Sequence, residues 1–207
     1  MINELFSLQD KTCVVTGGSR GLGFAIARIF LEAGARRVYI TARKEAACQE
    51  AAKELSEYGE CIAIPSDLGK MEEIERFANF LKEKESTIDV LVNNAGVGWL
   101  ATMEDFPEMG WDKVMDLNVK SPFFLTQKLL PLLKEGASPD DTASVINIGS
   151  IAGILGRTDT LSYAPSKSAI HQVTRNLAFV LADQHIRVNA IAPGRFHTKM
   201  TDYAKVD

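Results

Sequence analysis

The chain has few of the features that mark membrane, secreted or metal-binding proteins. No apolar run approaches the roughly 18 residues that span a bilayer, and no basic segment followed by an apolar one forms an export signal. The three cysteines and the three histidines lack the spacing of metal ligands. An odd number of cysteines fits reduced thiols in a cytosol. We therefore expect a cytoplasmic protein that holds no metal and enters no membrane.

Positive charge is also in short supply. The chain carries 23 Lys and Arg against 27 Asp and Glu, and its net charge of −4 argues against a nucleic-acid partner. It has no internal repeat, no low-complexity tract and no linker. Because 46% of its 207 residues are hydrophobic, the chain can form one domain with a substantial core. We predict a single domain over residues 1–207.

Strand and helix patterns alternate along the chain. Such alternation predicts an α/β fold, in which helices cover both faces of a parallel sheet. In sheets of this doubly wound Rossmann type, ligands bind beyond the carboxyl ends of the strands. The predicted strands are 12–16, 38–41, 61–64, 88–92, 144–148 and 187–191, and the predicted helices are 21–33, 44–57, 71–83, 111–133 and 163–183.

A glycine-rich turn joins the first predicted strand to the first predicted helix. Glycines allow a tight turn and a close backbone approach, and the helix offers unpaired N–H groups and the positive end of its dipole. The turn therefore predicts a cradle for a nucleotide diphosphate, with an ordinary turn as the alternative. Its sequence is Gly17-Gly18-Ser19-Arg20-Gly21-Leu22-Gly23. The helix that follows should pack through a stripe of Leu22, Ile26, Ile29 and Phe30.

Tyr163 and Lys167 stand four residues apart and therefore share one face of the last predicted helix. A free tyrosine has a pKa near 10 and is a poor proton donor at neutral pH. A lysine ammonium about 4 Å away favours the phenolate by roughly 4 kcal/mol at an effective dielectric constant near 20. The pair is thus a candidate general acid, and Ser150 is a candidate for holding a substrate oxygen. A surface tyrosine beside a solvated lysine is the alternative for the pair alone.

These features together resemble the short-chain dehydrogenase/reductase family. Asn93-Asn94-Ala95-Gly96, Asn118, and Pro193-Gly194 followed by Thr198 occur in family order and at family-like spacing. The resemblance implies that Asn118 anchors a proton relay to Lys167, and that both act in catalysis with Ser150 and Tyr163. It implies the following cofactor-binding residues: Gly17, Ser19, Arg20, Gly21, Leu22, Gly23, Arg43, Asp67, Leu68, Asn94, Ala95, Gly96, Tyr163, Lys167, Pro193, Gly194 and Thr198.

The end of the second predicted strand bears on the choice of cofactor. NAD enzymes of this kind place an acidic residue about 20 residues after the glycines, where it binds the ribose 2′-hydroxyl. Ala42 occupies that place here. Arg43 instead offers a planar fork for a 2′-phosphate, and Arg20 can reach the same side. We therefore predict NADP(H) as the cofactor. Asp67 resembles the family's adenine contact, with a turn-capping aspartate as the alternative.

Three further features carry a finer resemblance: Trp99 just past the Asn93–Gly96 motif, Trp111-Asp112-Lys113-Val114-Met115, and Ala192-Pro193-Gly194-Arg195-Phe196. They resemble the acyl-reductase branch of the family, especially the NADPH-dependent β-ketoacyl reductases associated with rhamnolipid synthesis. This resemblance implies reduction of a 3-oxoacyl thioester. The alternatives are an NADP-dependent alcohol, sugar or steroid dehydrogenase and, as a non-enzyme, a dinucleotide-sensing regulatory protein. A sensor needs no proton donor, so the intact Asn–Ser–Tyr–Lys set argues against it. The candidates for an apolar substrate pocket are Trp99, Leu100, Ile151, Leu155 and Phe196.

The family continues for several tens of residues beyond its Pro-Gly motif, whereas this chain stops at Asp207. We therefore expect a C-terminally incomplete domain that lacks the last helix, the last strand and part of a substrate-covering lid. The resemblance also implies a homo-oligomer, a tetramer or a dimer, which pairs the helices around Trp111 and Tyr163 across subunits.

Overall fold

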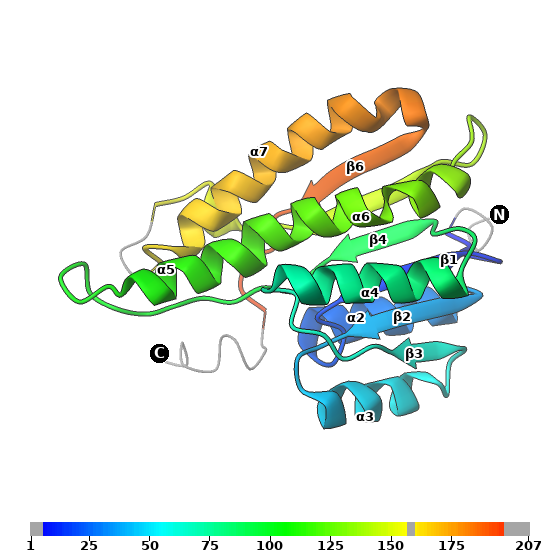
Figure 1. The fold of residues 1–207 in the computed structure, drawn as a ribbon, viewed down its shortest axis with the longest axis horizontal. Helices are drawn as coiled ribbons and strands as arrows, with labels where there is room; N and C mark the ends of the chain where they lie inside the picture. The colour runs from blue at the N-terminus through cyan, green and yellow to red at the C-terminus, as the bar shows by residue number, and fades with distance from the viewer. Residues whose placement is uncertain (1–5, 157–159, 197–207) are drawn as a thin grey trace.

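The computed structural model describes residues 6–156 and 160–196, and its centre is a parallel β-sheet (Figure 1). Six strands follow one another in the order β3-β2-β1-β4-β5-β6, and every neighbouring pair is parallel. Their carboxyl ends therefore share one edge, and the strand order reverses between β1 and β4. This confirms the predicted α/β fold. The strands are β1 (Thr12–Thr16), β2 (Arg37–Thr41), β3 (Cys61–Ala63), β4 (Val90–Asn93), β5 (Ala143–Ile148) and β6 (Ile186–Ile191).

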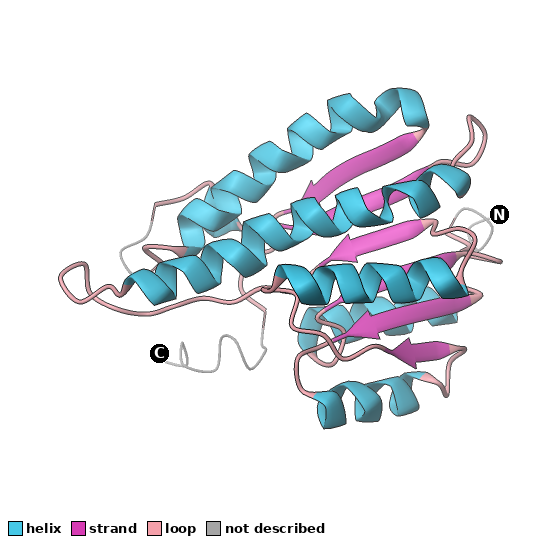
Figure 2. Cartoon of the chain, viewed as in Figure 1, coloured by secondary structure: helices cyan, strands magenta, loops and turns pink. Residues whose placement is uncertain are grey.

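Helices cover the sheet on both faces (Figure 2). On one face, α2 and α3 contribute Ala27, Leu31 and Leu55 to a buried cluster. On the other face, α4 and α6 contribute Phe77 and Leu129 to a second cluster, and the end of α7 joins it. None of the helices formed by the described residues combines the length and hydrophobicity needed to cross a bilayer. The helices are α2 (Gly21–Glu32), α3 (Glu45–Leu55), α4 (Met71–Lys84), α5 (Glu108–Met115), α6 (Ser121–Glu135) and α7 (Tyr163–Leu181).

The burial of the strands follows this layering. Every residue of β1 is buried, because helices lie on both of its sides. In β6, Ile186 and Val188 are buried while Arg187 and Asn189 are exposed, as expected for a strand that is covered on one face. Among the described residues, no strand pairs with the outer side of β6.

The predicted apolar stripe of α2 is wrong in part. The buried residues of this helix are Gly23, Ala27 and Leu31, whereas Ile29 is 59% exposed. A Cβ at Gly23 would stand 2.3 Å from the carbonyl oxygen of Gly17, so the helix lies against the glycine turn through its smallest residue. Close approach of Gly23 to the turn therefore constrains the rotation of α2, in addition to the packing of its apolar residues on the core.

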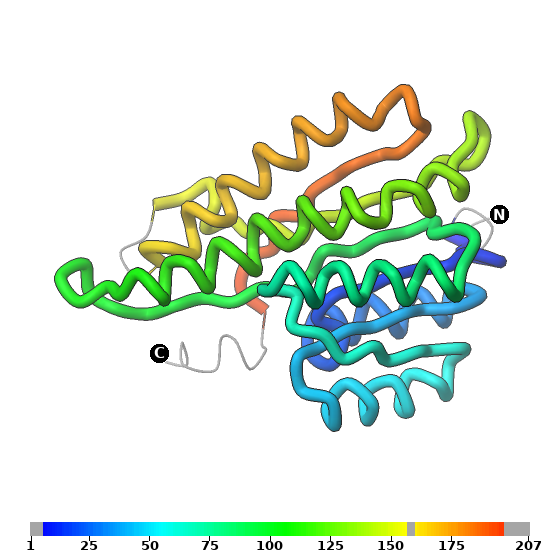
Figure 3. Tube along the Cα trace, in the orientation of Figure 1, coloured from blue at the N-terminus to red at the C-terminus, as the bar shows by residue number. Residues whose placement is uncertain are grey.

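The single helix predicted over residues 111–133 is also wrong in detail. α5 and α6 run as one rod (Figure 3), but the π-helical turn η1 (Asp116–Lys120) joins them. The N–H of Ser121 bonds to the carbonyl of Asp116, five residues back. Pro122 has no N–H and cannot make the α-helical bond to the carbonyl of Asn118, four residues earlier. The proline thus favours a local departure from α geometry, and Asn118 is the buried residue of this turn.

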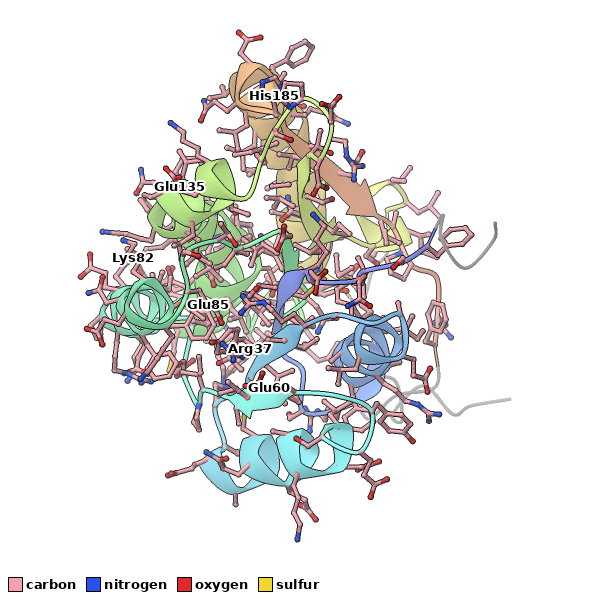
Figure 4. The ribbon with its side chains drawn as sticks, turned by 90° about the vertical axis from the view of Figure 1, so that its right-hand side faces the viewer. Arg37, Glu60, Lys82, Glu85, Glu135 and His185 are labelled. Atoms are coloured by element: carbon pink, nitrogen blue, oxygen red, sulfur yellow. The ribbon has the colours of Figure 1, made fainter. Side chains whose placement is uncertain are left out.

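A charged cluster around the buried Glu85 joins the amino ends of β1 and β2 to the end of α4. The Glu85 carboxylate accepts hydrogen bonds from Arg36 at 2.7 Å, from Arg37 at 2.6 Å and from the Tyr39 hydroxyl at 2.6 Å. Arg37 also pairs with Glu60 at 2.8 Å, and Figure 4 shows these side chains beside one another at the edge where the strands begin. Burial raises the pKa of Glu85, but the three donors lower it more, so this pKa lies below its usual range.

Replacing Glu85 by Gln should lower the free energy of unfolding. The amide keeps the shape of the side chain but removes the negative charge opposite Arg36 and Arg37. Arg36 is exposed and Arg37 keeps its pair with Glu60, so the loss at pH 7 should be about 1.5–3 kcal/mol. The lowered pKa of Glu85 contributes stability above about pH 4.3, the ordinary pKa of glutamate, and this stability is lost as the pH falls through the folded-state pKa. The difference in free energy of unfolding between wild type and variant should therefore become smaller in acid.

Urea unfolding near pH 7 and near pH 3.5 measures both effects, with Glu83→Gln as the control because Glu83 is exposed on the same helix. Equal stability of wild type and Glu85→Gln at neutral pH would show that the cluster contributes no net stability.

Candidate active site

The glycine turn after β1 forms a cradle at the carboxyl edge of the sheet. Gly17 and Gly21 adopt φ angles of +67° and +56°, which side chains disfavour. Arg20 occupies the N-cap of α2, and within the described residues its side chain caps no N–H of the helix. The first turn of α2 contains no acidic residue. The N–H groups of this helix end therefore remain available to an anion, as a diphosphate site requires.

The loop after β4 is tied to this turn. The hydroxyl of Thr16 accepts hydrogen bonds from the N–H groups of Asn94 and Ala95, both at 2.9 Å. The Asn94 amide donates back to the carbonyl of Thr16 at 2.8 Å and to that of Gly17 at 3.2 Å. Two of the predicted cofactor segments therefore form one continuous surface. Ser19 is half-buried within it, and Leu68 beyond β3 is buried.

Asn118 connects three elements. Its side-chain oxygen accepts from the N–H of Val97, and its amide donates to the carbonyl of Val97 and to the hydroxyl of Ser166, each at 2.9 Å. The Ser166 hydroxyl in turn donates to the carbonyl of Tyr163 at 2.7 Å. The predicted catalytic residues on η1 and at the start of α7 are thus linked through Ser166.

Lys167 is buried at the centre of the site. Its ammonium donates to the carbonyl of Ile148 at 2.6 Å and lies 5.6 Å from the centroid of the Tyr163 ring. A Cβ at Gly96 would stand 3.6 Å from this nitrogen, so the loop after β4 passes close by. Burial lowers the pKa of Lys167 to about 8. The lysine therefore still carries its proton at neutral pH.

Ser150 reaches the same place from the end of β5. It is buried, and its hydroxyl accepts from the N–H of Ala152 at 3.1 Å. The 3-10 turn η2 (Ile151–Gly153) that follows packs on α7, because a Cβ at Gly153 would stand 2.6 Å from the backbone of Lys167. This packing brings the Ser150 segment against the helix that carries Tyr163 and Lys167.

The remaining predicted cofactor residues border this region. Arg43 is exposed beyond β2 and lines a pocket of about 600 Å³ together with Asp67, Lys70 and residues of α5. The cations Arg43, Lys70 and Lys113 line this pocket together with the carboxylates Asp67, Glu108, Asp112 and Asp116, so a phosphate bound there would meet charges of both signs. The carbonyl of Pro193 accepts from the N–H of Ile151 at 3.1 Å, which places the Pro-Gly motif beside η2, and Gly194 next to it is exposed. Thr198 lies outside the described residues.

Comparison with known proteins identifies the family. The family model of short chain dehydrogenases matches residues 11–207. The chain belongs to the short-chain dehydrogenase family. This confirms the resemblance found in the sequence.

Two curated relatives of this short-chain dehydrogenase cover most of its length. The rhamnolipids biosynthesis 3-oxoacyl-[acyl-carrier-protein] reductase of Pseudomonas aeruginosa is 51% identical over 207 residues, which are 100% of this chain and 80% of the relative. The 5-keto-D-gluconate 5-reductase of Escherichia coli is 34% identical over 97% of this chain and 77% of its own.

Two solved structures show the same fold. The Pseudomonas aeruginosa RhlG/NADP active-site complex has a TM-score of 0.92 and 51% identity, over 96% of this chain and 77% of that one. A gluconate 5-dehydrogenase of Burkholderia cenocepacia, in complex with NADP and tartrate, has a TM-score of 0.90 and 26% identity, over 100% of this chain and 80% of that one.

Ser166 and Val97 of the dehydrogenase were missed in the sequence. Ser166 was visible within the stretch from Tyr163 to Lys167, three residues after the tyrosine, at the spacing of one helical turn. Val97 takes part through its backbone alone, so its side chain carried no signal. In the part of the chain that the structure describes, no group of His, Cys, Asp and Glu is arranged to hold a metal ion.

Lys167→Met should change the pH dependence of stability in the dehydrogenase. The pKa of Lys167 falls from 10.5 to about 8 on folding. Between these values the unfolded chain holds a proton that the folded chain has released, so wild-type stability rises with pH. The variant lacks this titration. From pH 7 to pH 10, the free energy of unfolding of the wild type should therefore rise by on the order of 2 kcal/mol relative to that of the variant.

Urea unfolding of both proteins at several pH values measures the difference, with the exposed Lys82→Met as control. Parallel pH curves for wild type and Lys167→Met would contradict a buried, charged lysine at neutral pH.

Proposed function

We propose that this short-chain dehydrogenase reduces a 3-oxoacyl thioester to the 3-hydroxyacyl thioester with NADPH. The observation that carries the proposal is the buried Lys167 ammonium beside Tyr163, at the edge where the glycine cradle opens. The reductase of Pseudomonas aeruginosa, 51% identical over the whole chain, supports the substrate class.

NADP(H) is the cofactor that the cradle fits. The free N–H groups at the start of α2 would hold the diphosphate, and Arg43 with Arg20 would hold the 2′-phosphate. Asp67 would contact the adenine, although its carboxylate also accepts from the N–H of Gly69 at 3.4 Å, as a turn-capping aspartate does. Asn94 to Gly96, which pass close to Lys167, would line the nicotinamide ribose. When bound, NADPH supplies the hydride that reduces the carbonyl carbon.

Four side chains of the protein perform the proton chemistry. Ser150 holds the carbonyl oxygen of the substrate, and Tyr163 gives that oxygen its phenolic proton as negative charge develops on it. The Lys167 ammonium stabilises the phenolate that remains, since it is buried and lies close to the phenol ring. Asn118 fixes the start of α7 through Ser166, so the phenol keeps its place.

A sugar reductase is the second candidate. The gluconate reductase of Escherichia coli, at 34% identity, favours it. Reduction of 3-oxoacyl thioesters and of keto-sugars by the same preparation with NADPH separates the two functions. A dinucleotide sensor that turns over neither class would retain NADPH binding alone.

The cytoplasmic location and the homo-oligomer remain predictions, and the mass in solution tests the latter.

Tyr163→Phe should abolish turnover and leave NADPH affinity within a few-fold of wild type. The phenylalanine keeps the ring but has no proton to give, and general acid catalysis is typically worth about 10²–10⁴-fold. NADPH consumption measures turnover and nucleotide fluorescence measures binding. Tyr58→Phe, at a tyrosine of the α3–β3 loop, is the matched control. More than about 1% residual activity in Tyr163→Phe would exclude the phenol as the acid.

Arg43→Ala should weaken NADPH binding by about 10- to 100-fold and leave NADH binding nearly unchanged. The variant loses a charge-assisted hydrogen bond to a phosphate that NADH lacks. Titration of both nucleotides, with the exposed Lys53→Ala on α3 as control, measures the ratio of affinities. Equal losses for NADPH and NADH would assign Arg43 a structural role.

A further inference from the structure

The indole of Trp99 packs against α5 at Gly110, where there is no room for a larger side chain. A Cβ added at Gly110 of α5 would stand 2.7–2.8 Å from three carbons of the indole, so the ring lies directly on the helix backbone. The Lys113 ammonium, one turn further along α5, is 5.3 Å from the ring centroid, within the range of a cation–π contact. The indole is thereby fixed in place, although it is only half-buried.

The loop that carries Trp99 is fixed at a second point. Val97 exchanges two hydrogen bonds of 2.9 Å with Asn118. One residue earlier, Gly96 passes the ammonium of Lys167. The loop therefore leaves the catalytic centre at Gly96 and follows the α5–α6 rod toward its amino end. Its two attachment points on the rod, Asn118 and Gly110, are roughly 12 Å apart at a rise of about 1.5 Å per residue.

The loop thus passes Lys167 at Gly96 and reaches the position of the indole at Gly110, about two helical turns from Asn118 along the rod. A long acyl chain extended along this loop would reach the indole, and a short one would end nearer Lys167. Leu100 and Met103 are exposed on the loop of Trp99, and Ile151 and Leu155 are exposed beyond Ser150. Exposed apolar side chains that continue from a polar reaction centre are typical of a site for an apolar ligand.

We propose that Trp99 determines the acyl-chain preference of this reductase, as a fixed apolar wall against which the distal half of the chain packs. The inference rests on the proposed function. Gly110 is then a positioning residue for specificity, because any side chain there would displace the indole from the backbone of α5. Neither residue touches the carbonyl that is reduced.

The kinetic test compares two substrates in the variants Trp99→Ala and Gly110→Ala. For a 3-oxodecanoyl thioester, kcat/KM should fall by about tenfold or more, the scale of lost contacts in an apolar pocket. For a 3-oxobutanoyl thioester it should stay within about threefold of wild type, and NADPH affinity should not change. Phe179→Ala, at an exposed aromatic residue near the end of α7, is the control. Equal losses with both substrates, or no loss with either, would overturn the inference.

A binding test separates this inference from the proposed function. The chain contains two tryptophans, so Trp111→Phe leaves Trp99 as the only one. Decanoyl-coenzyme A, which lacks a ketone to reduce, should change the emission of Trp99 in the presence of NADP⁺, and butanoyl-coenzyme A should not. An unchanged emission with decanoyl-coenzyme A would overturn the role of Trp99. Absence of thioester reduction by the wild type, with a keto-sugar reduced instead, would overturn the proposed function and the acyl wall together.

Discussion

The side chain of Asn118 is the contact on which the arrangement of the candidate site depends. One buried amide pairs with the backbone of the loop after β4 and with the hydroxyl of Ser166 at the start of α7. It therefore fixes the distance between the loop that passes Lys167 and the helix that carries Lys167. An apolar residue in its place would leave the part-buried N–H and carbonyl of Val97 without these partners, at about 1–3 kcal/mol each. The fold supplies this residue at the point where two helices join through a π turn.

The two edges of the sheet have different electrostatic characters. At the amino edge, Glu85 is buried, but its charge is matched by Arg36 and Arg37 and its pKa is lowered. At the carboxyl edge, Lys167 is buried with a neutral carbonyl as its partner, and its pKa is lowered toward neutrality. A buried charge with matching partners keeps its ionised form, whereas burial without them makes the group responsive to a ligand. The charge at the amino edge is thus compensated within the fold, and the charge at the carboxyl edge is not.

Much of the fold could be predicted because its strongest signals are local. The strand over residues 12–16 was predicted with its true bounds, and the other strands within two residues at each end, since apolar runs between turns mark buried strands. The rotation of α2 could not be predicted, because it depends on contact between Gly23 and Gly17. The π turn was missed because hydrophobic periodicity does not register one extra residue per turn. The packing of Trp99 on Gly110 was missed because a glycine inside a helix has no side chain to indicate what it contacts.

The π turn has a consequence for the two ends of the rod. A π turn is equivalent to one residue inserted into an α-helix, and one residue corresponds to a rotation of about 100°. The turn thus uncouples the face that α6 presents to the core from the face that α5 presents to Trp99. Evolution of the family could adjust one face against the other by gaining or losing a single residue between Asp116 and Lys120, with the sheet and both helices otherwise unchanged. The rod therefore behaves as two helices whose rotation about the common axis can change independently.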